Sequence, residues 1–273
     1  MEVEEEEEFN CGGATYKTVS LVNFVYTHKC FPTGWDNFLD IKEVKAEIAK
    51  ISVRLAEDAK AGEIEPPMPN VFKALTVSLN DIKAVIIGQD PTPQAGKATG
   101  LAFSLNPLED PRNVPTILNI LVELKLEGHG VSLTNGDLSP WLSQGVLLLN
   151  AALTIPQGGE PGTHLSIWLP FTKLLVQYIS KNALHSSAWI IWAGKAAGIG
   201  NKIDKGQKVD KTHHYIYSKG YHPSPWASVK NNEFFGYNHF NCVNQFLTET
   251  KRGPINWNLP HRSGFISDMK PCY

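Results

Sequence analysis

Short apolar runs recur along the chain and are separated by longer segments with a helical pattern. Four of the runs have the length of buried strands: Ala84–Ile87, Val146–Leu149, Ala188–Trp192 and His214–Tyr217. Apolar residues at three- and four-residue steps predict helices at about 116–126, 168–180, 193–203 and 233–249. Strands that alternate with helices are typical of a parallel sheet covered on both faces. The pattern predicts a single α/β domain with a central four-stranded parallel sheet flanked by helices on both faces.

An additional amphipathic helix is predicted before the first strand. Its apolar stripe starts at Ile41 and continues to Leu55, Gly62 follows it, and Asp40 is a candidate N-cap. The proline-rich segment 65–69 then breaks the helical pattern. The stretch up to about Leu39 is irregular and rich in aromatic residues.

Composition and charge narrow the class of protein. A chain of 273 residues with 42% hydrophobic residues is that of an ordinary globular protein, and this excludes a collagen or a coiled coil. No apolar run approaches the ~18 residues of a membrane span, and the acidic N-terminus is unlike a signal or transit peptide. We therefore expect a soluble, intracellular protein.

The net charge of −2 is unevenly distributed. Six of the 27 acidic residues lie within residues 1–9, so the rest of the chain has 21 acidic against 25 basic residues and a net charge of +4. We interpret residues 1–13 as an acidic disordered tail, with an interaction tail or a charge mimic as the alternative. The mildly basic body is compatible with DNA binding but does not require it.

The spacing of the cysteines does not predict a metal site. Cys11, Cys30, Cys242 and Cys272 form no C-x-x-C pair, so neither a zinc site nor a secreted disulfide framework is predicted. We expect four reduced thiols in a reducing compartment.

Residues that could take part in catalysis or binding follow the predicted strands. In parallel sheets, ligands bind beyond the carboxyl ends of the strands. Asp90 stands there on a proline-stiffened turn, Asn150 directly after three leucines, and His222 before Pro-Ser-Pro. Phe103 offers a stacking ring, and Trp226 an apolar wedge at a loop tip. Each residue also has a structural interpretation: an Asx turn for Asp90, a loop-pinning amide for Asn150 and a core aromatic for Trp226. Together they suit an enzyme that acts on a base removed from the duplex.

Three long motifs in register carry a family resemblance. The segment Gly88–Leu105 resembles the water-activating motif of family-1 uracil-DNA glycosylases, which reads G-Q-D-P-Y-H and continues to G-L-x-F-S. The segment 144–151 is similar to the family's uracil-recognition strand, and His222–Pro225 to its minor-groove intercalation loop. Weaker likenesses occur at 192–195, 234–240 and 253–257. Since the resemblance runs from about Trp35 to Trp257, we assign residues 14–257 to the α/β domain and residues 258–273 to a C-terminal tail.

The resemblance implies hydrolysis of the N-glycosidic bond of deoxyuridine in DNA, without a metal or cofactor. Asp90 would position the attacking water, and His222, in its neutral form, would donate a hydrogen bond to uracil O2. Asn150 would pair with N3–H and O4, Phe103 would stack on the flipped ring, and the backbone near Gln89 would help to hold the base. The implied DNA contacts are Ser104, Pro115, Ala193, Gly194, Lys195, Ser224, Trp226 and Ser228.

Several positions depart from the family pattern. Thr92 stands where the family has a tyrosine against uracil C5, and Pro93 stands where a histidine follows, a replacement also seen in poxvirus-type enzymes. A single methyl is worth only ~1–3 kcal/mol in a pocket, so Thr92 leaves open whether thymine is excluded. Trp226 replaces the usual leucine wedge, and Ala227 replaces a phosphate-contacting serine.

Three alternatives follow from these departures: an active uracil-DNA glycosylase, a glycosylase that also releases thymine, and a DNA-binding or partner-recruiting protein with an impaired pocket. The expected partner is uracil-containing single- and double-stranded DNA. A protein inhibitor or replication partner is left open. No membrane partner is expected, and the chain is expected to be a monomer. The expected location is the nucleus for a eukaryote or a nuclear-replicating virus, and otherwise the cytoplasm.

Overall fold

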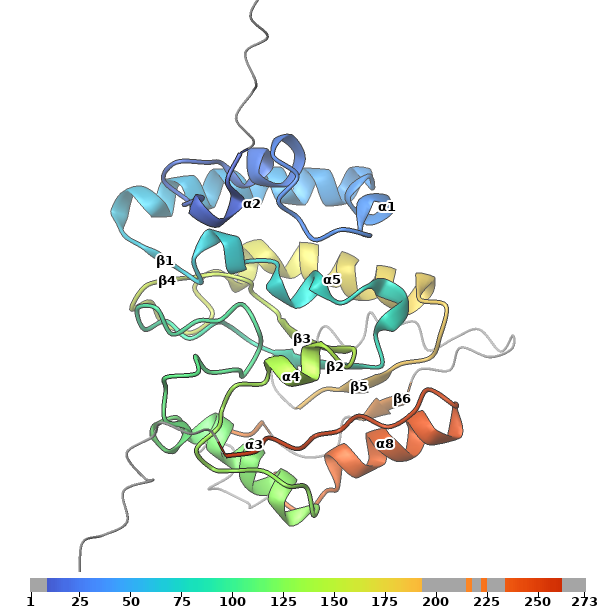
Figure 1. Cartoon of the computed structure of the whole chain (residues 1–273). Coiled ribbons are helices and arrows are strands. Elements are labelled where there is room, and N and C mark those ends of the chain that lie inside the picture. Colours follow the sequence, from blue (N-terminus) through green and yellow to red (C-terminus); the bar gives the residue numbers. More distant parts are fainter. Residues whose placement is uncertain (1–8, 193–214, 218–221, 225–233, 262–273) are drawn as a thin grey trace, which may run out of the picture.

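The computed structural model describes residues 9–192, 215–217, 222–224 and 234–261 (Figure 1). Its main sheet has the strand order β3-β2-β5-β6, and all three pairings are parallel. These strands are β2 (Ala84–Gly88), β3 (Val146–Asn150), β5 (Ala188–Ile190) and β6 (Tyr215–Tyr217). The predicted parallel α/β architecture is therefore confirmed.

Helices cover the sheet in layers. Helix α2 (Lys42–Ala61) packs on α5 (Leu165–Asn182), which lies over one face of the sheet, while α3 (Pro115–Leu126) and α8 (His239–Glu249) lie on the other face (Figure 1). Two short helices, α1 (Asp36–Leu39) and α4 (Ser139–Leu142), complete the set of α-helices in the described ranges. All five residues of β2 and of β3 are buried, as the continuous apolar runs predict.

The remaining elements are short. β1 (Ile64–Glu65) pairs antiparallel with β4 (Ile155–Pro156) outside the main sheet. A π-helical turn, η2, spans Asn23–Thr27. The 3-10 turns are η1 (Cys11–Gly13), η3 (Met68–Asn70), η4 (Lys73–Thr76), η5 (Leu79–Asp81) and η6 (Pro111–Asn113).

Helix boundaries differ from the sequence-based ones at three helices. Helix α5 begins at Leu165, three residues before the predicted start. Asp40 is the C-cap of α1 rather than the N-cap of α2; Ile41 precedes α2, and Asp40 pairs with Lys45 at 3.0 Å. The helix predicted from about 233 begins at His239, because Asn238 has a left-handed backbone with φ 58° and starts a new helix. The helix predicted at 193–203 lies outside the described residues.

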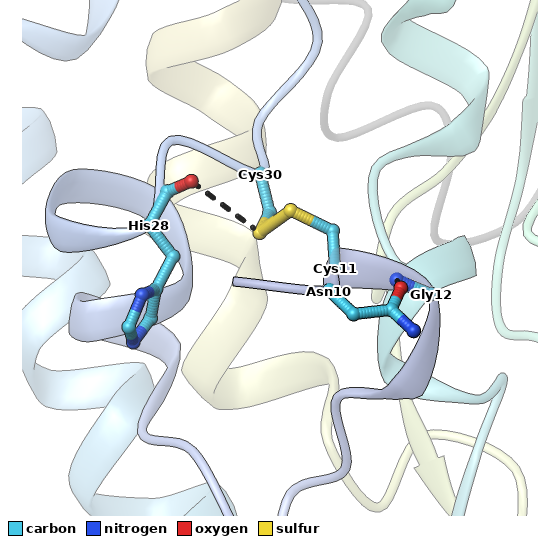
Figure 2. The surroundings of a disulfide bond; sticks show 5 residues. All are labelled: Asn10, Cys11, Gly12, His28 and Cys30. Atoms are coloured by element: carbon cyan, nitrogen blue, oxygen red, sulfur yellow. Dashed lines mark hydrogen bonds between the residues drawn. A yellow bond between two sulfur atoms is a disulfide. The ribbon is translucent and has the colours of Figure 1, made fainter. Parts of the chain in front are cut away.

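The cysteine prediction was wrong for two of the four thiols. Cys11 and Cys30 form a disulfide with a Cα–Cα separation of 5.7 Å (Figure 2). Their spacing of 19 residues carried no signal, because only the fold of residues 9–35 brings the two together. Cys242 is a free thiol, and Cys272 lies outside the described residues.

The ordered ends of the chain extend beyond the predicted domain boundaries. Phe9 stacks on His28 at 3.6 Å between ring centroids, so residues 9–13, which we placed in the acidic tail, belong to the folded body. Residues 1–8 lie outside the described residues. At the other end Leu259 is fully buried and bridges Val131, so the folded body continues past Trp257.

The described residues contain neither a membrane-spanning helix nor a cluster of metal-binding side chains. None of their helices combines the length and the apolar character of a membrane span. Nor do His, Cys, Asp and Glu side chains gather there in threes as a metal site would need.

Candidate active site

The site lies where β2 and β3 end side by side. The two strands are paired so that Gly88 stands opposite Asn150. The backbones stay together beyond the strands, because the Ala151 and Ala152 N–H groups donate to the carbonyls of Gly88 and Gln89, each at 2.9 Å. Asp90 is thereby held next to Asn150, although 60 residues of sequence separate them.

A cavity of about 520 Å³ opens at this edge of the sheet. Seven of the predicted site residues line it: Gln89, Asp90, Thr92, Phe103, Asn150, His222 and Ser224. They come from the end of β2, the end of β3 and two loops. The candidates for base chemistry therefore share one cavity.

Asp90 is held in place by two hydrogen bonds. Its Oδ2 accepts a hydrogen bond from the Gly162 backbone N–H at 3.0 Å and another from the neighbouring Gln89 side-chain amide. Pro91, which follows, is buried. In an Asx turn, the carboxylate of Asp90 would accept a hydrogen bond from the backbone of its own turn. Gly162 lies instead in the distant loop between β4 and α5. A carboxylate held in this way presents a fixed acceptor to the cavity.

His222 is held as a neutral donor. Its Nδ1 accepts the Ser224 backbone N–H at 3.1 Å, and burial lowers the pKa of the imidazole below its usual 6.5. A neutral ring that accepts at Nδ1 carries its proton on Nε2. His222 can therefore offer one N–H to a ligand oxygen at neutral pH.

Phe103 has a strained backbone with φ 63°. This left-handed conformation is uncommon for a bulky residue and is typical of functional sites. The ring packs edge-on against Trp192 at 5.3 Å between centroids and lies 5.9 Å from the His222 ring. Phe103 is half-buried and contributes a face to the cavity wall.

Asn150 requires a glycine as its neighbour. A Cβ built on Gly88 would lie 2.3 Å from Asn150 Oδ1 and 3.1 Å from the Ala102 Cβ. Such a distance to the oxygen is a clash, so only glycine at position 88 lets the amide occupy its place at the cavity.

The predicted DNA contacts are distributed unevenly. Ser224 lines the cavity, and Pro115 is an exposed first residue of α3. Ser104 is buried, and its Oγ accepts the Leu138 backbone N–H at 3.0 Å, so in this structure the hydroxyl stabilises a loop. Outside the described residues lie Ala193, Gly194, Lys195, Trp226 and Ser228.

Sequence reasoning missed part of the cavity wall. Pro161 and Ile155 line it from the chain after β3, and Val114 and Ile117 from the start of α3. Gly162, which holds Asp90, was also missed. None of these positions has a local signal, since their contacts depend on how distant segments meet.

Comparisons with known proteins point to one family. Residues 76–248 match the Uracil DNA glycosylase superfamily. The chain is 34% identical over 227 residues to a uracil-DNA glycosylase of Amoebophilus asiaticus, covering 82% of this chain and 97% of the relative. It is equally similar to the enzyme of Lactococcus lactis subsp. cremoris, with 34% identity and coverage of 83% and 98%.

Solved structures show the same fold. The crystal structure of mimivirus uracil-DNA glycosylase superimposes with a TM-score of 0.75 at 27% identity, covering 89% of this chain and 91% of that one. A mimivirus UNG variant in complex with UGI gives a TM-score of 0.72 at 25% identity, with coverage of 92% and 99%. With the superfamily match, the bacterial relatives and the cavity residues together, this chain belongs to the uracil-DNA glycosylase family.

Proposed function

We propose that the cavity at the end of β2 and β3 binds a uracil extruded from DNA, and that Asp90, His222, Asn150 and Phe103 carry out its release. As a uracil-DNA glycosylase, the chain hydrolyses the N-glycosidic bond, which leaves free uracil and an abasic site. The observation that carries the assignment of residues is that an acid, an imidazole donor, an amide and an aromatic ring line a single cavity.

The negative charge of the Asp90 carboxylate acts on the water and on the sugar. The two hydrogen bonds to Oδ2 hold the carboxylate in place, so it can orient a water toward C1′ and favour the oxocarbenium-like sugar. His222 acts on the leaving base: its Nε2–H donates to O2 as negative charge develops there.

Asn150 and Phe103 recognise the base. The amide of Asn150 presents both an acceptor and a donor, which suits N3–H and O4 of uracil and mismatches cytosine. The Phe103 ring stacks on the pyrimidine, and the backbone near Gln89 completes the wall. Reading a flipped base by hydrogen bonds and stacking offsets the few kcal/mol that extrusion costs.

DNA is the macromolecular partner, as single or double strands. Trp226 fills the gap left by the base, and Ser224, Ser228 and residues 193–195 contact phosphates. Ser104 is a weaker candidate, because its hydroxyl is already engaged with Leu138. The mimivirus complex with UGI supports a protein inhibitor as a second class of partner.

The domain and its location are part of the proposal. We infer a single domain that contains residues 14–257 and extends at its two ends into residues 9–13 and 258–261, with a four-stranded sheet covered on both faces, and that acts as a monomer. We place it in the nucleus of a eukaryote or of a cell infected by a nuclear-replicating virus, and otherwise in the cytoplasm. Disulfides are rare in reducing compartments, so the bond between Cys11 and Cys30 weighs against this location.

Asp90→Asn tests the mechanism. Since an amide has almost the same shape but no charge, the variant should still bind uracil-containing DNA while uracil release from a synthetic single strand is abolished. Full activity of the variant would contradict the role of Asp90. Binding of DNA by the wild-type chain without any release would favour the DNA-binding alternative.

A wider substrate range is favoured by one observation: Thr92 lines a cavity of about 520 Å³ beside the base-recognition residues. A threonine leaves room for a substituent at C5 of the pyrimidine. Thymine release should therefore be measurable from T-containing strands and disappear in Thr92→Tyr. Equal thymine release by both proteins would exclude Thr92 as the determinant.

A further inference from the structure

The loop between β4 and α5 holds the catalytic carboxylate. Its Gly162 N–H donates to Asp90 Oδ2 at 3.0 Å, and its Pro161 lines the cavity. Gly162 has φ 90°, a backbone conformation that residues other than glycine rarely adopt. The Gly162 carbonyl accepts the Leu165 N–H at 3.1 Å, so Gly162, whose own N–H faces Asp90, is tied to the first turn of α5.

His164, two residues further along, is an anchor for this turn. The residue is fully buried, and both ring nitrogens have partners: Nδ1 meets Thr154 Oγ1 at 2.8 Å, and Nε2 meets Asp58 Oδ2 at 3.1 Å. Thr154 Oγ1 also accepts the Trp168 indole N–H at 2.6 Å. The imidazole therefore joins three elements: the chain before β4, α5 and α2.

The protons of this network can be assigned. Burial outweighs the opposite effect of Asp58 and lowers the pKa of His164 below its usual 6.5, so at neutral pH the ring is mainly neutral and carries one proton. Asp58 Oδ2 is a carboxylate oxygen and can only accept, which places the proton on Nε2. Thr154 then donates its hydroxyl to Nδ1 while it accepts from Trp168. In this arrangement both ring nitrogens of His164, the Thr154 hydroxyl and the Trp168 indole N–H each have a partner.

Asp58 fixes the end of the His164 hydrogen-bond network that lies nearest to solvent. It lies on α2, with its side chain 22% exposed, and forms a 2.6 Å ion pair with Arg54 one turn earlier. The chain of contacts runs from Arg54 and Asp58 on α2 through His164 to the turn at Gly162 and then to Asp90. The other end of the loop is held separately, by the Gly158 N–H that donates to the Pro93 carbonyl at 2.8 Å.

We propose that His164 is a positioning residue for catalysis, which with Asp58 holds the Gly162 N–H against the catalytic carboxylate of Asp90. The proposal rests on the function proposed for Asp90. Neither His164 nor Asp58 touches the substrate, so their loss acts on the orientation of Asp90 and leaves DNA binding unaffected. A displacement of about 1 Å at a reacting group can cost on the order of 100-fold in rate. Because Pro93 still holds the loop, we expect a loss of about 10- to 100-fold in kcat.

Asp58 provides the cleanest test, because its side chain is partly exposed and a variant is expected to fold. Asp58→Ala removes the acceptor of the His164 Nε2–H, whereas Asp58→Asn keeps an oxygen at that place. The kcat of Asp58→Ala for uracil release should fall about 10-fold or more with KM for DNA unchanged, and Asp58→Asn should recover most of the rate. His164→Asn, which retains a group near Nδ1, and His164→Gln, which reaches toward Asp58, extend the series.

Glu47→Ala is the matched control. Glu47 also lies on α2 and forms a 2.7 Å ion pair with Lys50, and among the described residues no hydrogen bond or ion pair joins it to His164 or Asp58. Glu47→Ala should retain the wild-type kcat. Circular dichroism at the assay temperature verifies that each variant is folded, and if the His164 variants do not fold, the Asp58 pair decides.

The outcomes separate this proposal from the proposed function. Wild-type release of uracil that is abolished in Asp90→Asn supports the proposed function whatever Asp58 does. With that result in hand, a wild-type kcat for folded Asp58→Ala overturns the positioning role. So does a rise in KM at constant kcat, or an Asp58→Asn rate as low as that of Asp58→Ala.

Discussion

Gly88→Ala is the substitution for which the structure gives the sharpest expectation. The added Cβ would lie 2.3 Å from Asn150 Oδ1, whereas real contacts of this kind are essentially never below 3.0 Å. The strand backbones cannot separate easily, since β2 and β3 are paired along their whole length and β2 also pairs with β5. The amide of Asn150 must therefore move by at least about 0.7 Å.

This displacement is large on the scale of catalysis. A misplacement of about 1 Å costs on the order of 100-fold in rate, equivalent to about 2.7 kcal/mol of transition-state stabilisation. Uracil release by Gly88→Ala should fall by about that factor. Discrimination against cytosine should weaken as well, because the displaced group is the one that reads the N3–H and O4 edge.

Single-turnover assays with excess enzyme on uracil-containing and cytosine-containing oligonucleotides measure both effects. Gly62→Ala is the matched control, because its Cβ would meet no atom within 4 Å and its backbone is extended. A Gly88→Ala enzyme with wild-type rate and selectivity would refute the argument that Asn150 needs this space.

Three further predictions concern stability and pH. Cys30→Ser should lower the free energy of unfolding by about 3 kcal/mol, because the bond to Cys11 closes a separation of 19 residues in the unfolded chain. In the wild-type protein, Cys11 and Cys30 should not react with a thiol reagent after denaturation until the disulfide is reduced. A reactive thiol at either position would contradict the disulfide. Burial raises the pKa of Glu127 from 4.5 to about 7. As the pH rises, Glu127 therefore loses its proton in the unfolded chain before it does so in the folded protein, and the free energy of unfolding falls from about pH 4.5 to 7. Denaturant melts should show Glu127→Gln gaining stability relative to wild type across that window, and a constant difference would refute the shift. Burial lowers the pKa of His222 below 6.5, so the ratio of the wild-type uracil-release rate to that of His222→Gln should stay constant above pH 6.5 and fall only in more acidic buffer; a decline that begins above pH 6.5 would contradict a buried, neutral imidazole.

Local pattern was sufficient for much of the fold. The runs at Ala84–Ile87 and Val146–Leu149 became β2 and β3, because a strand buried on both faces must be apolar throughout. The stripe from Val44 to Leu55 became the buried face of α2 for an equally local reason, the 3.6-residue period of the helix. Asp40 failed as a cap because α1, which ends there, has too few residues to produce a periodic signal.

The sequence by itself determined which chemical groups follow the strands: Asp90, Asn150 and His222 could be named because each lies within a few residues of an apolar run. Only the tertiary structure decided what holds and encloses them. The hydrogen bond from Gly162 to Asp90 spans 72 residues, and that from His164 to Asp58 spans 106. Such contacts depend on how α2, α5 and the strand ends pack together. The disulfide escaped prediction for the same reason, since two cysteines 19 residues apart meet only when the chain between them folds back.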